Sequence, residues 1–458
     1  MPRMPDTPPS PDPRARRAEP FAGRRARLAA ALRDAGGGLA VVPTAPLRRR
    51  NGHDNDHPFR PASHFRWLTG FEEPEAWLLL DASGRSTLLL RPRDPEQELW
   101  DGPRLGPEAA CDALGVDAAH PVAELDARVV DALVDQPALW TLFGAGDTLA
   151  PPVDRWLERA RVRTARAGEP PGAHRDLAAL IDEMRVVKDA HEIAALRRAA
   201  DIAAAGHVRA MRACRPGLRE YELEAELLHE FRRRGAAGPS YELIVAAGAN
   251  ACVLHHPAGD TELRAGELCL IDAGCEWDGY ASDVTRTFPV DGRFGGPQRA
   301  LYELVLAAQE AAVAATRPGA RKQDAHWAAV RVIAQGLLDL GLLKRDALGS
   351  LDDVVASGAY RRFFMHGTGH WLGLDVHDVG DYLSATEAPV EQPDGHGGRV
   401  VRRPSRRLVP GMVLPSSPAC TCRPHPTSTS AGGASASASR TTRSSPPTAA
   451  SCSAAACR

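Results

Sequence analysis

The 458-residue sequence predicts an α/β (α+β) protein of two domains. Three observations carry this prediction: the length, short apolar runs alternating with helix-like stretches in the first third, and strong amphipathic helices around a hairpin pattern later. Hydrophobic residues make up 43% and charged residues 25%, a mix typical of a globular chain that buries a sizeable core. A Pro- and Arg-rich start, residues 1–20, is predicted to be disordered.

The first domain is predicted over residues 21–173. Its strand-like apolar runs are short and fall between helix-like segments, which favours a mixed sheet. They lie at residues 39–42, 77–80, 87–90 and 139–142. A Gly- and Pro-rich stretch at 165–173 is the predicted linker.

The second domain is predicted over residues 174–414 and begins with helices. Asp189 and Glu192 form a capping-box pattern, and apolar residues follow at helical spacing until Arg215-Pro216-Gly217 ends the helix. A second helix carries an apolar face, and two more are predicted at 298–313 and 322–340. That face is made by Leu223, Leu227 and Phe231.

Charge and composition exclude several classes of function. The formal net charge is -2, so no broad attraction to nucleic acid or to an anionic membrane is expected. No apolar run is long enough to cross a bilayer, and the N-terminal segment lacks the apolar core of a signal peptide. We therefore expect a cytoplasmic protein with reduced cysteines.

The stretch from 267 to 290 contains two aspartates that the sequence brings together. Asp278-Gly279 is a strong two-residue hairpin signal, and it pairs Asp272 with Thr285 and Asp283 with Gly274. Asp272 and Asp283 then share one face of the hairpin, a diagonal step apart. Two such carboxylates on a mostly apolar hairpin repel each other, and one or two divalent metal ions are the natural counter-charge. The alternative is a pair of ordinary surface aspartates.

A second cluster is rich in histidine. His366, His370 and His377 lie with three glycines within twelve residues of apolar sequence. Histidine is a common metal ligand and proton shuttle. The alternative is that one or two of them are core histidines satisfied by backbone groups, but that explanation is weak for all three. His255, which precedes His256 and Pro257, is weak evidence by itself.

These residues resemble those of bacterial Xaa-Pro aminopeptidase (aminopeptidase P), one of the pita-bread metallopeptidases, which include prolidase, creatinase and methionine aminopeptidase. The resemblance runs from about residue 60 to residue 414. It rests on five segments: 68–75, 271–276, 282–288, 366–380 and 410–414. No single segment is specific, but the combination is.

The resemblance implies a creatinase-like N-terminal domain, a pita-bread catalytic domain and a two-metal hydrolase, usually manganese-activated. It implies that Asp272 ligates one metal ion through both oxygens, that Asp283 bridges the pair, and that His370 ligates the other. His255, His366 and His377 would line the site, orient the substrate and shuttle protons. A water shared by the two ions would become a hydroxide nucleophile near neutral pH.

The implied substrates are peptides with proline in the second position, and the implied assembly is a dimer or tetramer of identical chains. Trp100 lies where bacterial members carry a tryptophan that reaches a neighbouring subunit's active site. Prolidase, which cuts only dipeptides, is the rival among enzymes. A non-catalytic pita-bread protein that binds peptides or a partner is the rival of another class.

The last 44 residues, 415–458, break the pattern. They contain 11 Ser and 10 Ala but no acidic, aromatic or large aliphatic residue, a composition typical of a disordered, low-complexity tail. A metal knuckle from Cys420, Cys422 and His425 is the alternative, but the spacing matches no common zinc site.

Two glutamate ligands of the family are missing from this tail. The family carries one in a Val-Glu-Pro-Gly-Leu-Tyr run almost directly after the segment that ends at Leu414. Residues 415–422 can be encoded by CCG TCG AGC CCG GCC TGT ACA TGC, and moving each codon boundary back by one base gives Val-Glu-Pro-Gly-Leu-Tyr-Met. Residues 436–442 likewise yield Val-Arg-Ile-Glu-Asp, which matches the run that holds the second glutamate.

These codons suggest a one-base frameshift near codon 415, in the gene or in its sequencing. The chain's 56 basic residues include only three lysines, which indicates a GC-rich gene whose shifted frames favour Ala, Arg, Pro and Ser. Without the two glutamates, one histidine and two aspartates remain, too few to enclose two hard cations. We therefore expect poor manganese binding, little or no catalysis and a catalytic domain that lacks its final strands.

Overall fold

The computed structural model describes residues 13–146, 148–166, 168–394, 398–421, 435–437 and 441–444. The chain forms two compact units, residues 1–184 and residues 185–458, and each is described by itself.

The first unit is built on a six-stranded mixed sheet in the order β6-β5-β4-β1-β7-β8. β1 pairs with β4 antiparallel and with β7 parallel, so the predicted mixed sheet is confirmed. The strands are β1 (Leu39–Pro43), β2 (Arg49–Asn51), β3 (Asn55–Asp56), β4 (Trp77–Asp81), β5 (Ser86–Leu90), β6 (Ala118–Pro121), β7 (Ala138–Thr141) and β8 (Ala173–Asp176). The helices are α1 (Pro13–Asp34), α2 (Ser63–Thr69), α3 (Pro95–Asp101), α4 (Gly106–Leu114), η1 (Val122–Glu124), α5 (Leu125–Ala132), α6 (Val153–Thr164) and α7 (Ala178–Val186), whose last two residues belong to the second unit.

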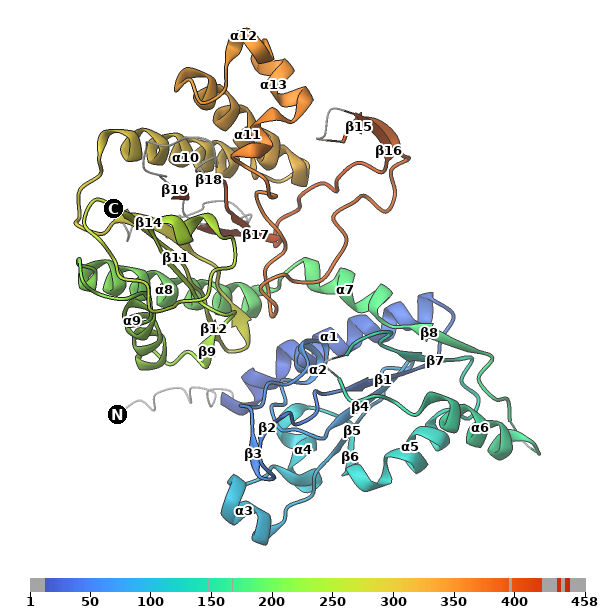
Figure 1. The fold of residues 1–458 in the computed structure, drawn as a ribbon. Helices are drawn as coiled ribbons and strands as arrows, with labels where there is room; N and C mark the ends of the chain where they lie inside the picture. Colours follow the sequence, from blue (N-terminus) through green and yellow to red (C-terminus); the bar gives the residue numbers. More distant parts are fainter. Residues whose placement is uncertain are drawn as a thin grey trace, which may run out of the picture. The chain divides into compact units, whose positions relative to one another are not determined.

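Helices cover this sheet (Figure 1). Alternate residues of β1 and β4 pack with Val129 of α5 and Trp156 of α6 in one buried cluster. Burial of these aliphatic and aromatic side chains stabilises the unit by roughly 1.5–3 kcal/mol for each fully buried residue.

The predicted disorder of residues 1–20 is wrong for its last part, because α1 begins at Pro13. Proline is tolerated in the first turn of a helix, where its missing N–H would have no intrahelical acceptor. The residues that follow are mostly Arg and Ala, which favour helix.

The second unit contains two three-stranded sheets, ordered β10-β11-β14 and β13-β12-β9, and three two-stranded sheets, β15-β16, β17-β20 and β18-β19. The strands are β9 (Gly238–Pro239), β10 (Ile244–Ala247), β11 (Leu268–Asp272), β12 (Cys275–Trp277), β13 (Tyr280–Ala281), β14 (Thr285–Pro289), β15 (Val390–Pro393), β16 (Arg399–Arg402), β17 (Val413–Ser416), β18 (Ala419–Thr421), β19 (Ser435–Ser437) and β20 (Thr441–Ser444). The helices are α8 (Ala190–Ala213), α9 (Glu220–Arg233), η2 (Gly248–Cys252), α10 (Gly296–Ala315), α11 (Lys322–Asp339), α12 (Arg345–Leu348), α13 (Leu351–Ser357) and η3 (Ala359–Arg362).

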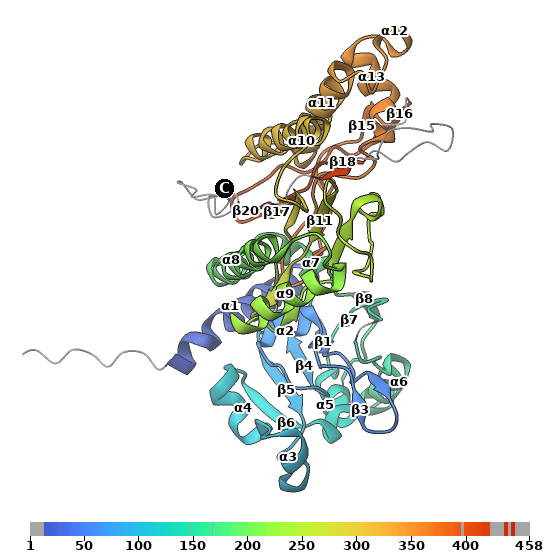
Figure 2. The ribbon, with the colours of Figure 1, turned by 60° about the vertical axis from the view of Figure 1, so that its left-hand side comes forward.

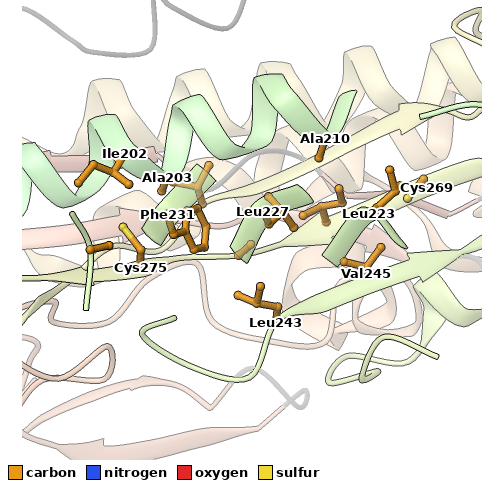
Figure 3. Close-up of a cluster of buried hydrophobic side chains, with 14 of the residues drawn as sticks. Ile202, Ala203, Ala210, Leu223, Leu227, Phe231, Leu243, Val245, Cys269 and Cys275 are labelled. Carbon is orange, nitrogen blue, oxygen red and sulfur yellow. The ribbon is translucent and has the colours of Figure 1, made fainter. Parts of the chain in front are cut away.

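The core of this unit lies between two helices and the sheet β10-β11-β14. The predicted capping box at the start of α8 is present, and the predicted apolar face of α9 is buried. Figure 3 shows one buried cluster in which Ile202 of α8 and Phe231 of α9 lie near Cys275, and Leu223 of α9 lies near Val245 and Cys269. This packing supports β11, the strand that ends at Asp272.

The helices predicted at 298–313 and 322–340 are α10 and α11, which lie side by side in both views (Figures 1 and 2). Their buried faces form a second cluster with α13 and the segment after it. Cys420, from the tail, is fully buried in this cluster.

The tail was expected to be disordered, yet it contributes strands. Ala419–Thr421 (β18) pairs with Ser435–Ser437 (β19), and Thr441–Ser444 (β20) pairs with β17. Strand pairing depends on backbone N–H and C=O groups, which every residue except proline supplies, and Cys420 adds an apolar contact. The second unit therefore has short strands at residues where we expected none. Cys422 and His425, the other members of the metal-knuckle alternative, lie outside the described residues.

Within the described part of the chain, no helix is both long and apolar enough to span a bilayer.

Candidate active site

The two predicted aspartates lie at the ends of neighbouring strands. Asp272 is the last residue of β11 and pairs with Thr285 in β14, the register that the hairpin signal predicts. The turn residues Asp278 and Gly279 have φ values of 51° and 75°, and two successive positive values are what a type I′ turn requires. Asp283 follows β13 and is fully buried, and Asp272 is 7% exposed.

Tyr241 joins these two carboxylates. Its hydroxyl lies 2.5 Å from Oδ1 of Asp272 and 3.1 Å from Oδ1 of Asp283. One hydroxyl proton cannot satisfy both acceptors fully, so the tyrosine links the carboxylates through one shared donor. The sequence analysis missed this residue, because a tyrosine at the start of a strand-like run carries no signal of its long-range partner.

His370 completes this group. Its Nε2 lies 3.1 Å from Oδ2 of Asp283, and its Nδ1 lies 2.9 Å from the carbonyl oxygen of Trp371. The ring of His377 contacts it edge to face, with centroids 4.1 Å apart. Four of the residues predicted from sequence therefore lie in one group: Asp272, Asp283, His370 and His377.

The other predicted residues are placed elsewhere. His366 contacts the ring of Phe364, with centroids 5.0 Å apart, and its Nδ1 lies 2.8 Å from the carbonyl oxygen of Gly367. His255 is exposed in the segment between η2 and β11. Trp100, on α3 of the first unit, is 85% exposed.

A buried ion network holds the segment that follows His370. Asp378 accepts hydrogen bonds from Arg185 at 2.5 Å and from Lys188 at 2.8 Å, and its backbone N–H donates to the carbonyl of Trp371. All three charged side chains are almost completely buried, so the loss of Asp378 would leave the buried Lys188 without the carboxylate it pairs with. Sequence reasoning missed this network because Asp378 lies 190 or more residues from both of its partners.

A buried histidine supports the strand that carries Asp272. Nε2 of His207, on α8, lies 3.1 Å from the carbonyl oxygen of Ala273. Desolvation lowers the pKa of His207 from 6.5 to about 4, so the ring is neutral near pH 7. This contact fixes the backbone next to Asp272.

The segment after Leu414 lies against the histidine-rich loop. The backbone N–H of Ser417 donates to the carbonyl of Thr368 at 2.7 Å, two residues before His370. Ser416 and Ser417 are each 7% exposed, and neither hydroxyl has a hydrogen-bond partner among the described residues. Residues 415–417 thus bring two unsatisfied hydroxyls and no carboxylate to this part of the unit.

The residues present do not fit a pair of metal ions. Among the described residues, no group of three or more His, Cys, Asp or Glu side chains is arranged to hold a metal ion. Asp272, Asp283 and His370 instead form hydrogen bonds with one another or with Tyr241. Three donors are fewer than one hard cation normally takes, and two cations need more.

Comparison with known proteins identifies the family. The profile of metallopeptidase family M24 matches residues 194–437, and that of the aminopeptidase P N-terminal domain matches residues 21–140. The chain belongs to metallopeptidase family M24. This membership confirms the pita-bread fold expected for the second unit and implies divalent metal ions.

Several relatives of this chain are Xaa-Pro aminopeptidases. That of Escherichia coli K12 is 41% identical over 392 residues, 85% of this chain and 84% of that protein. That of Haemophilus influenzae is 42% identical over 370 residues, 80% of this chain and 81% of that protein. The structure of Pseudomonas aeruginosa aminopeptidase PepP matches with a TM-score of 0.83 and 40% identity, over 94% of this chain and 93% of that one.

Proposed function

We propose that this chain descends from a manganese-dependent aminopeptidase that hydrolyses the N-terminal Xaa-Pro bond with a water activated by two metal ions. We propose further that the chain as written is inactive, because two glutamate ligands are missing. One observation supports the proposed inactivity. The backbone of Ser417 hydrogen-bonds to Thr368, two residues before His370, and the serine brings no carboxylate there.

The codons that can encode residues 415–422 support a frameshift as the cause of the missing glutamates. In the shifted reading, the codon GAG takes its first base from codon 416 and the other two from codon 417, so glutamate would stand in place of Ser417. Cys420, buried in the core, would become leucine, the residue that an apolar cluster favours. One small change in the gene would thus restore a carboxylate at the site and an aliphatic side chain in the core.

The remaining assignments follow from the proposed descent. Asp272 and Asp283 would be metal ligands together with His370, and His255, His366 and His377 would orient the substrate and move protons. A proline nitrogen carries no N–H, so selection of Xaa-Pro must rely on shape and apolar contact. We also propose a cytoplasmic homo-oligomer in which the exposed Trp100 reaches a neighbouring subunit.

Two measurements test the proposed function. Sequencing the gene across codons 405–458 from fresh genomic DNA decides the frameshift: an uninterrupted Val-Glu-Pro-Gly frame refutes a genomic lesion. If the shifted reading cannot be built from the actual codons at all, the frameshift hypothesis fails.

Parallel assays of the frame-restored protein on Xaa-Pro and Xaa-Pro-Xaa peptides test the specificity. Cleavage of the longer peptide is expected, and cleavage of the dipeptide alone would identify a prolidase. If the restored protein binds metal ions but cleaves neither peptide, the non-catalytic peptide-binding alternative holds.

A further inference from the structure

Glu220, the first residue of α9, is completely buried beneath a loop that runs from Ala247 to Gly259. This loop includes η2, which contacts β11, the strand of Asp272. It also carries His255, one of the predicted site residues. Glu220 therefore joins the start of α9 to the loop that carries His255.

The carboxylate of Glu220 accepts hydrogen bonds from both ends and the middle of the loop. Oε1 accepts from the backbone N–H of Ala247 at 2.8 Å and from the side chain of Asn250 at 3.0 Å. Oε2 lies 2.9 Å from Nε2 of His256 and accepts from the backbone N–H of Gly259 at 3.0 Å. One side chain thus satisfies four groups spread over thirteen residues.

The charge on Glu220 strengthens these bonds. Burial by itself would raise the pKa of the carboxyl, but the hydrogen bonds from the four loop groups outweigh it, and the pKa lies below its ordinary value. The side chain is therefore an ionised acceptor for all four donors, and such bonds are roughly twice as strong as neutral ones.

We propose that Glu220 is a positioning residue, which holds the 247–259 loop against β11 and so fixes the segment that carries His255. The four loop groups that meet this carboxylate are all donors, and Glu220 supplies the acceptor oxygens that they share. A glutamine at this position would point its NH₂ group, itself a donor, at two of these donors. Two hydrogen bonds would then be lost and replaced by repulsion between N–H groups. Any effect of Glu220 on catalysis rests on the proposed function, whereas its positioning of the loop does not depend on that function.

The test compares Glu220→Gln with Glu222→Gln in the full-length chain. Glu222 lies in the same first turn of α9 and accepts from the backbone N–H of Arg219 instead of from the loop. Both variants remove one negative charge from the same helix terminus. An effect confined to Glu220→Gln thus separates loop positioning from helix capping.

Hydrogen exchange and diethyl pyrocarbonate labelling report on the loop without requiring activity. In Glu220→Gln we expect amide exchange in 247–259 to be at least about tenfold faster, and labelling of His256 to rise relative to His255 because Nε2 is released. Equal exchange and labelling in the two variants would overturn the proposal. Because neither readout needs turnover, the result does not depend on whether the chain is an active enzyme.

A second variant covers the case in which Glu220→Gln does not fold. Asn250→Ala removes one donor from the loop and leaves the buried carboxylate with three. A smaller increase in exchange, confined to the loop, is expected. Unchanged exchange in Asn250→Ala would count against Glu220 as the anchor of this loop.

Discussion

Nε2 of His370 lies 3.1 Å from Oδ2 of Asp283, a side chain with no exposed surface. The other oxygen of Asp283 accepts from Tyr241, which also donates to Asp272. The three predicted ligands therefore belong to one hydrogen-bonded group, which contains two carboxylates, one imidazole and the hydroxyl of Tyr241. Such a group needs further anionic ligands to enclose two metal ions.

Metal binding should distinguish the chain as written from its frame-restored form. After incubation with Mn²⁺ and gel filtration, elemental analysis should find well under one ion per chain as written and close to two per restored chain. The reason is ligand number, since two aspartates and one histidine do not enclose two hard cations. Two tightly held ions in the 458-residue chain would contradict this.

Replacing Tyr241 by phenylalanine should destabilise the protein. The change removes a donor shared by two buried carboxylates, and the loss of hydrogen bonds to buried charged groups costs about 1–3 kcal/mol. Urea unfolding near pH 7 measures the loss. Tyr221→Phe is the matched control, because Tyr221 is 47% exposed, and its effect should stay within about 0.5 kcal/mol. Equal effects would show that the Tyr241 hydroxyl contributes nothing.

The buried His207 predicts a pH dependence of stability. In the unfolded chain it takes up a proton below about pH 6.5, whereas the folded chain keeps it neutral down to about pH 4. The contribution of His207 to the free energy of unfolding is therefore complete above pH 6.5. It falls as the pH drops toward 4, by about 3 kcal/mol in total. His207→Gln, which can still donate to Ala273, should show a flatter dependence in this range. An unchanged slope would refute the assignment.

Gly274 is required by close backbone approach. A Cβ atom there would lie 1.8 Å from the carbonyl oxygen of Ser282 and 2.6 Å from Oγ of Ser240. Gly274→Ala should therefore force apart the segments that carry Asp272 and Asp283 and cost about 3 kcal/mol or more. Gly238→Ala is the control, because its Cβ would meet no atom within 4 Å. Thermal unfolding and soluble yield compare the two, and a fully stable Gly274→Ala would contradict this packing.

Local sequence signals predicted the parts of the structure that depend on local physics. The Asp278-Gly279 turn set the register of Asp272 with Thr285 because only a few turn conformations connect two such strands. The capping box at Asp189 likewise marked the start of α8. These features arise within a few residues and do not require knowledge of the tertiary fold.

Long-range contacts could not be predicted in the same way. Tyr241 meets Asp283 across 42 positions, and Lys188 meets Asp378 across 190. No periodicity or turn pattern encodes such pairs. The strands at 435–437 and 441–444 were missed for another reason: composition predicts the burial of side chains, whereas strand pairing depends on the backbone.

The most direct test of the central claim is the cleavage of an Xaa-Pro-Xaa peptide by the purified 458-residue chain in the presence of Mn²⁺, beside the frame-restored protein. We predict that the restored protein releases the first residue and that the chain as written gives no cleavage above the metal-only blank. Robust cleavage by the 458-residue chain would contradict the claim that the site lost its function with its two glutamates.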